Sequence, residues 1–98
     1  LTAECVSVED AAGSFIYTFR HDYSPEMARR GYFTVDKGSV TVNGVSLTVC
    51  RPTENTFQVC IITYTYNNTN FHAIKGGTVV NIECDIIGKY LARIQSLL

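Results

Sequence analysis

The fold of this protein is decided by one stretch, KGSVTVNGVSLTVC at residues 37–50. Apolar and polar residues alternate on both sides of Asn43 and Gly44, and an Asn-Gly pair in this setting is the strongest short-range signal for a β-hairpin. A two-residue turn fixes the register, so that Val40 pairs with Leu47. We therefore predict a hairpin with one apolar face, and this face belongs to the core.

The opposite face of the predicted hairpin is polar. Its cross-strand pairs are Thr41 with Ser46, Ser39 with Thr48, and Lys37 with Cys50. Because side chains alternate along a strand, these pairs place a cation and four hydroxyl groups on one surface. Such a surface is suited to binding a polar small molecule.

The rest of the chain extends the β pattern. Runs rich in β-branched and aromatic residues predict strands over residues 2–8, 14–20, 57–62 and 78–85. Residues 24–31 have the capping pattern of a short helix, and apolar residues from Ile86 onward recur at the spacing of an amphipathic helix. Residues 64–77 form the longest irregular stretch. Together these elements predict a small all-β barrel.

Composition sets limits on fold and function. The 98 residues are 46% hydrophobic, with eight Lys and Arg against nine Asp and Glu, which gives a net charge of -1. This length predicts one domain with a single core, and the near-neutral charge disfavours binding to nucleic acid or an anionic membrane. No apolar run approaches the roughly 20 residues of a membrane span. The chain begins at Leu1 without Met or a signal segment, so we expect a piece of a longer protein or a processed chain.

The cysteines and histidines show no metal-binding pattern. The four cysteines lack a Cys-x-x-Cys pair and a histidine nearby in sequence: Cys5, Cys50, Cys60 and Cys84. Each lies in an apolar or alternating segment, where a free buried thiol is commoner than a disulfide or a zinc ligand. We predict reduced core cysteines in a cytosolic protein, and surface or loop positions for His21 and His72.

Two stretches resemble the riboflavin synthases of the alpha-chain type, a family built from two similar lumazine-binding domains. KGSVTVNGVSLTV at residues 37–49 is similar to the family's KGSIxVDGISLTV, and VNIECDII at residues 80–87 is similar to its VNLExDII. Ser46 stands where the family's first domain typically has a cysteine. With Lys37 and the predicted terminal helix, this serine makes the chain similar to the second, C-terminal domain.

The resemblance implies a six-stranded antiparallel Greek-key barrel with a short helix between strands and a C-terminal amphipathic helix. On this resemblance, we expect residues 1–98 to form this one lumazine-binding domain, with residues 85–98 supplying the end of the last strand and the helix. The family's second domain opens with a strand segment, HxVxGHVDG, that this chain lacks before Thr2. We therefore expect a fragment of a two-domain chain with its first strand missing, and an open barrel edge that promotes self-association.

An activity is also implied by the resemblance. Riboflavin synthases transfer a four-carbon unit between two dimethyl-ribityl-lumazine molecules, giving riboflavin and a ribitylamino-pyrimidinedione, without a cofactor or metal. The family's full-length enzyme is a homotrimer whose active site lies between the first domain of one subunit and the second domain of another. We expect a cytoplasmic transferase whose isolated domain is inactive. The alternative is a noncatalytic lumazine- or flavin-binding protein of the same superfamily, and a small-barrel oligonucleotide binder is disfavoured by the acidic balance.

Site residues follow where this chain matches the family's motifs. Catalytic roles are implied for Lys37, Ser46 and Asp85. Substrate contacts are implied for Lys37, Ser46, Leu47, Thr48, Ile62, Thr63, Tyr64, Thr65, Tyr66 and Asn67. The family shows PETLxxTxL where this chain has TYTYNNTNF, so Thr65 matches but Thr63 and Tyr64 do not.

Each of these assignments has a simpler interpretation. A hairpin lysine such as Lys37 is commonly a solvated charge, and hydroxyls such as Ser46 and Thr48 are ordinary in strands. Asp85 stands directly before the predicted helix, where an aspartate caps the helix without any catalytic role. The shared polar face and the motif match favour ligand contact for Lys37, Ser46 and Thr48, whereas for Asp85 both roles stay open.

Overall fold

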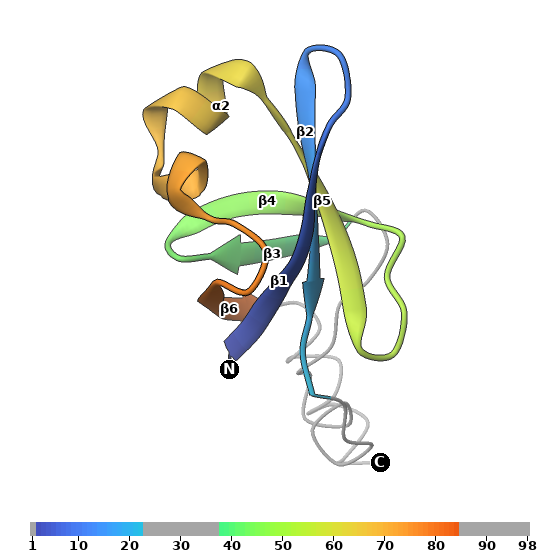
Figure 1. Ribbon diagram of the computed structural model, residues 1–98. Helices are drawn as coiled ribbons and strands as arrows, with labels where there is room; N and C mark the ends of the chain where they lie inside the picture. Colours follow the sequence, from blue (N-terminus) through green and yellow to red (C-terminus); the bar gives the residue numbers. More distant parts are fainter. Residues whose placement is uncertain (1, 23–37, 85–98) are drawn as a thin grey trace, which may run out of the picture.

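The protein folds into a closed antiparallel barrel. The computed structural model describes residues 2–22 and 38–84 of the chain. The elements, in chain order, are β1 (Thr2–Asp10), β2 (Ser14–Arg20), β3 (Ser39–Val42), β4 (Val45–Cys50), β5 (Thr56–Ile62), the helix α2 (Thr63–Asn68), the 3-10 helix η1 (Asn70–Ala73) and β6 (Val79–Cys84). The strands close in the order β1-β2-β5-β4-β3-β6 (Figure 1). The predicted six-stranded barrel is confirmed, while the helices predicted over residues 24–31 and 86–98 lie outside the described residues.

The prediction of a missing strand and an open edge is wrong. β1 pairs with β2 along most of its length and with β6 through residues 2–4. Two backbone hydrogen bonds of 2.7 Å continue the seam between β1 and the segment before β6: the Cys5 amide donates to the Thr78 carbonyl, and the Gly77 amide donates to the Cys5 carbonyl. The six described strands therefore close the barrel by themselves.

The β3–β4 hairpin has the predicted register. Val42 pairs with Val45 and Val40 with Leu47, and the Val49 amide donates to the Gly38 carbonyl at 2.8 Å. The turn residues Asn43 and Gly44 both have positive φ, 47° and 86°, as a type I′ turn requires. Because side chains alternate along each strand, Val40, Val42 and Val49 point into the core. The side chains of Ser39, Ser46 and Thr48 point outward and are exposed.

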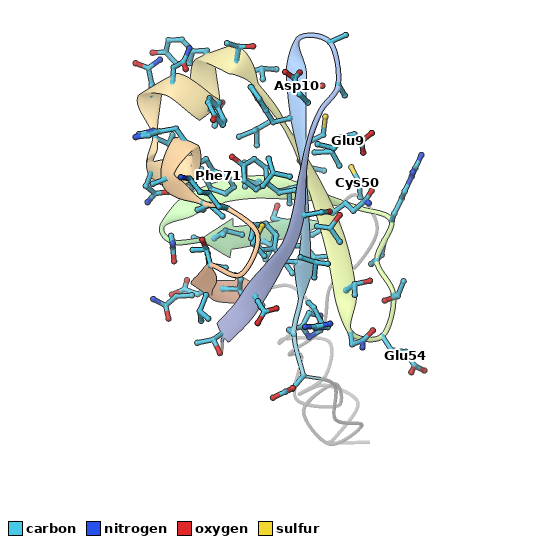
Figure 2. All side chains as sticks on the ribbon, viewed as in Figure 1. Glu9, Asp10, Cys50, Glu54 and Phe71 are labelled. Atoms are coloured by element: carbon cyan, nitrogen blue, oxygen red, sulfur yellow. The ribbon has the colours of Figure 1, made fainter. Side chains whose placement is uncertain are left out.

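Aromatic side chains fill the core of the barrel. Tyr17 and Phe19 of β2 and Phe57 of β5 are fully buried, as is Phe71 of η1. Phe71 lies between η1 and the strands (Figure 2) and meets the Tyr17 ring edge-to-face, with centroids 5.0 Å apart. The Tyr17 hydroxyl donates to the Phe71 carbonyl at 2.7 Å. This buried contact anchors η1 to β2.

The stretch predicted to be irregular, residues 64–77, contains most of α2 and all of η1, so that prediction is wrong there. The sequence of α2 is TYTYNN, which has no apolar stripe, and none of its residues is fully buried. The hydrophobic periodicity that reveals most helices is therefore absent. Side-chain hydrogen bonds support the segment instead: Thr69 Oγ1 donates to the Thr65 carbonyl at 2.6 Å and accepts from the Phe71 amide at 3.2 Å.

The cysteine and histidine predictions hold only in part. Cys5 is buried, but Cys50 is half-buried and Cys60 is exposed, because the neighbouring valines Val49 and Val59 take the inward positions of β4 and β5. His21 is buried rather than on the surface, since it continues the inward alternation of Tyr17 and Phe19. His72 is exposed as predicted, and the Cys84 side chain lies outside the described part. In residues 2–22 and 38–84, no helix has the length and apolar character needed to cross a membrane.

Candidate functional site

The outer face of β4 presents the hydroxyl groups that the sequence predicts. Ser46 and Thr48 are exposed, and between them Leu47 points the other way and packs against the core. Across the hairpin, Thr41 pairs with Ser46 and Ser39 with Thr48. The predicted polar face therefore exists over the described part of the hairpin, which begins at Gly38.

The ladder between β4 and β5 is short and then opens. It consists of two pairs, Val49 with Val59 and Cys50 with Gln58. Beyond these pairs β4 runs away from β5 toward the hairpin turn (Figure 1). If the register continued, Thr48 would oppose Cys60 and Ser46 would oppose Ile62. The divergence leaves the outer faces of both strands accessible, and Ile62 is 61% exposed.

The helix α2 follows directly from the open end of β5. Its first residue, Thr63, donates through Oγ1 to the Gly13 carbonyl in the β1–β2 turn at 3.3 Å. The Tyr66 ring stacks on Phe15 of β2, with centroids 3.9 Å apart and an interplanar angle of 15°. Thr65 is half-buried, whereas Tyr64 is 72% exposed. The stack and the Thr63 contact thus fix α2 beside the end of β5.

The η1 segment also ties α2 to the hairpin. Asn70 donates through Nδ2 to the Asn43 carbonyl at 3.1 Å, and Asn43 Oδ1 accepts from the Asn81 amide of β6 at 2.8 Å. The hairpin turn, η1 and β6 therefore meet at Asn43. The predicted residues on β4 and those on β5 and α2 belong to one connected framework, although no hydrogen bond joins the two groups of predicted side chains directly within the described residues.

Two predicted residues, Lys37 and Asp85, lie outside the described residues. Their described neighbours, Gly38 and Cys84, lie at the same end of the β3–β6 pair, because Val40 pairs with Cys84. The Gly38 carbonyl also bonds the Val49 amide of β4. The backbone flanking both predicted residues thus approaches the end of β4 that carries Thr48.

The residues between the two groups were not predicted as site residues. A hollow of about 190 Å³ on the outer face of β2, β4 and β5 is lined by Ile16, Cys50, Arg51, Gln58, Val59 and Cys60. Gln58 donates through Nε2 to Thr18 Oγ1 at 3.1 Å. The alternation of residues 57–62 predicts that Gln58 and Cys60 share a face with Ile62. This pattern could therefore have identified Gln58 and Cys60 as neighbours of the predicted site residue Ile62. Within the described segments, no group of three or more His, Cys, Asp and Glu side chains can hold a metal ion.

A larger hollow, of about 510 Å³, lies elsewhere and contains none of the predicted residues. It is lined by Thr2, Ala3, Glu4, Arg20, His21, Asp22, Asn55 and Val79. It borders Asp22, the last residue described before residue 38, and we assign no ligand to it. The polar face of β4 remains the better candidate because its residue types match the predicted chemistry.

This combination of a closed six-stranded barrel and a hydroxyl-bearing hairpin agrees with a family match. Residues 2–85 match the family of the lumazine binding domain. The chain belongs to this family, and the resemblance predicted from the sequence is confirmed.

Among the curated relatives are several riboflavin synthases. The enzyme of Bacillus subtilis (strain 168) is 40% identical over 92 residues, which cover 94% of this chain and 40% of the relative. That of Actinobacillus pleuropneumoniae is 38% identical over 90 residues, which cover 92% and 40%. That of Photobacterium phosphoreum is 46% identical over 59 residues, which cover 60% and 27%. The chain thus spans about 40% of the length of the first two relatives.

Proposed function

We propose that this chain is the lumazine-binding domain of a riboflavin synthase, a transferase that moves a four-carbon unit between two dimethyl-ribityl-lumazine molecules. The observation that carries the proposal is the family match over residues 2–85, together with riboflavin synthases that align with 94% and 92% of the chain. The relatives named above are all riboflavin synthases, which favours the enzyme over a noncatalytic carrier.

The ligand proposed for this site lies over the outer face of β4 and the open end of β5. In this proposal Ser46 and Thr48 donate hydrogen bonds to the pteridine ring or the ribityl chain, which their exposure supports. Leu47 packs against the core, so its role is to hold its two neighbours outward. The ring edge meets the segment from Ile62 to Asn67, where Thr63 and Tyr66 are already engaged by Gly13 and Phe15.

The chemistry needs more than one such face. Two ring systems must stack, a ring methyl must lose a proton, and polar groups must stabilise the resulting anion. We assign catalytic roles to Lys37, Ser46 and Asp85, with no cofactor. Because each ligand needs its own face, a single domain provides half of a site. The proposal therefore includes a two-domain chain, a homotrimer in the cytoplasm, and no turnover by the isolated domain.

The test is a fluorescence titration of the chain with riboflavin and with dimethyl-ribityl-lumazine. Ser46→Ala and Thr48→Ala should each weaken binding by several-fold to about tenfold, because a net hydrogen bond contributes about 0.5–1.5 kcal/mol. Ser7→Ala, at an exposed serine of β1, is the matched control and should bind as the unchanged chain does. Unchanged affinity in both β4 variants would contradict the proposed site. Turnover by the chain alone would contradict the two-domain requirement.

A further inference from the structure

Two thiols share the hollow on the outer face of β4 and β5. Cys50 pairs across the ladder with Gln58, and Cys60 lies two residues further along β5 on the same face. Both cysteines are free and line the same hollow of about 190 Å³. Cys50 lies on the side of β5 away from Phe71 (Figure 2). The two thiols are therefore diagonal neighbours on one accessible surface.

The diagonal spacing decides what can join them. Diagonal neighbours on adjacent strands have Cα atoms about 7–8 Å apart, whereas a disulfide needs roughly 4.4–6.8 Å and a sulfur–sulfur bond of about 2.05 Å. A metal ion between two sulfurs spans about 4.6 Å, since a typical metal–thiolate bond is about 2.3 Å. Because β4 diverges from β5 beyond the Val49–Val59 pair (Figure 1), the Cys50–Cys60 diagonal is at least this long. This spacing is too wide for a disulfide without backbone movement and favours a bridging ion over a direct bond between the two sulfurs.

We propose that Cys50 and Cys60 form a two-coordinate thiolate site for a monovalent soft cation of the Cu(I) class. Thiolates are the ligands that soft cations prefer. On binding, each thiol releases its proton to solvent and each sulfur forms one bond to the ion, so no electron is transferred. Ions that require four ligands do not fit, because the described residues offer no third or fourth metal-ligating side chain here.

Arg51 also lines this hollow. Two thiolates and one monovalent cation carry a net charge of one negative unit, which the positive charge of Arg51 offsets. The small number of ligands, rather than charge, favours a soft monovalent ion here, because thiolates are the ligands that Cu(I) prefers. The proposal uses none of the side chains assigned to lumazine binding, so it stands independently of the proposed function.

The test titrates the full chain with Ag(I), an air-stable probe of this class, in a buffer without thiols. One ion should bind per Cys50–Cys60 pair. Cys50→Ser and Cys60→Ser should each weaken this binding more than about 100-fold, because losing even an outer partner of a metal ligand costs roughly 10- to 100-fold. Arg51→Gln should weaken it about two- to fivefold, as expected for a partly solvated charge.

Cys5→Ala is the matched control, because burial raises the pKa of that thiol and removes it from the surface. It should bind the probe with unchanged affinity. Both serine variants retain the remaining cysteines. Any Ag(I) that these cysteines bind is therefore the same in the variants and in the unchanged chain, and it does not affect the comparison. Affinities of both serine variants within threefold of the unchanged chain would overturn the proposal.

A second measurement needs no variant. Dibromobimane, which links two nearby thiols, should join Cys50 to Cys60 within one chain, and peptide mapping would locate the link. A map in which both cysteines react singly, without the link, would equally overturn the proposal.

Discussion

The β3–β4 hairpin and the α2–η1 segment reach their structures by different routes. The hairpin is specified by its own local sequence. Alternating residues set its two faces, and Asn43 and Gly44 supply the two positive φ angles of the turn. The α2–η1 segment has no apolar stripe and no side-chain cap on α2. Contacts with β2 hold it in place, through the Phe15–Tyr66 stack and the Tyr17–Phe71 hydrogen bond.

This difference has a consequence for the proposed site. Ser46 and Thr48 lie on a hairpin whose geometry is set by its own sequence, whereas the residues from Thr63 to Asn67 depend on packing against β2. Helices as short as α2 are marginal without tertiary support. Damage to the packing should therefore disturb one half of the site and leave the other half in place.

Phe71→Ala should produce the largest effect and separate the two regions. Phe71 is fully buried against Tyr17 and Phe19, and truncating such a side chain costs about 3–5 kcal/mol. In hydrogen exchange, residues 63–73 should lose protection before the hairpin does. Tyr64→Phe, at an exposed position, is the control and should change neither measurement. Equal loss of protection in both regions would contradict the comparison.

Tyr17→Phe tests the hydrogen bond that links β2 to η1. The Phe71 carbonyl accepts two hydrogen bonds, from the Tyr17 hydroxyl at 2.7 Å and from the Ile74 amide at 3.0 Å. Removing the hydroxyl takes away the first and leaves the second, which costs about 0.5–1.5 kcal/mol. Urea unfolding at neutral pH should report this loss. The α2–η1 segment, and not the hairpin, should again account for the lost exchange protection.

The same hydroxyl should make stability depend on alkaline pH. Burial raises the pKa of Tyr17 from its ordinary 10.0 to about 12. Below pH 10 the neutral phenol is present in both states, and its contribution is complete. Between pH 10 and 12 the unfolded chain ionises first, so stability falls by up to about 1.4 kcal/mol per pH unit. The difference between the unchanged chain and Tyr17→Phe should shrink over this range; a constant difference would refute the assignment.

Gly44→Ala tests the local route directly. A Cβ at Gly44 meets nothing within 4 Å, so the cost comes only from its φ of 86°, about 1–2 kcal/mol for an L-residue. Thermal unfolding should show this loss. Gly76→Ala is the control, since its Cβ would make only an ordinary 3.6 Å contact with the Val6 carbonyl. If Gly44→Ala and Gly76→Ala were equally stable, the positive φ of Gly44 would not be what specifies the turn.

Arg20→Gln should give the smallest effect, because the residue belongs to neither region. Its guanidinium lies 3.1 Å from Glu4 Oε1, and both side chains are about half exposed. Exposed ion pairs contribute about 0–1 kcal/mol. The small destabilisation should vanish near 1 M salt, where the Debye length is roughly 3 Å. A loss that persists at high salt would reveal packing rather than charge.

The sequence by itself determined the hairpin, its register, the strand faces and the barrel class. These features depend on residue alternation and on a turn that two adjacent residues specify, and both are local properties of a chain. The polar face carrying Ser46 and Thr48 follows from the same alternation. Cys60, predicted as a buried thiol, is exposed because Val59 takes the inward position of β5.

Only the tertiary structure decided how the barrel closes and how residues 63–73 fold. Closure depends on β1 meeting β6, which are far apart in sequence, and no local pattern encodes that pairing. The position of α2 depends on Phe15 and Tyr17 receiving Tyr66 and Phe71. Aromatic residues in a polar stretch give no periodic signal, because their partners lie on another strand and come within reach only once the barrel has formed.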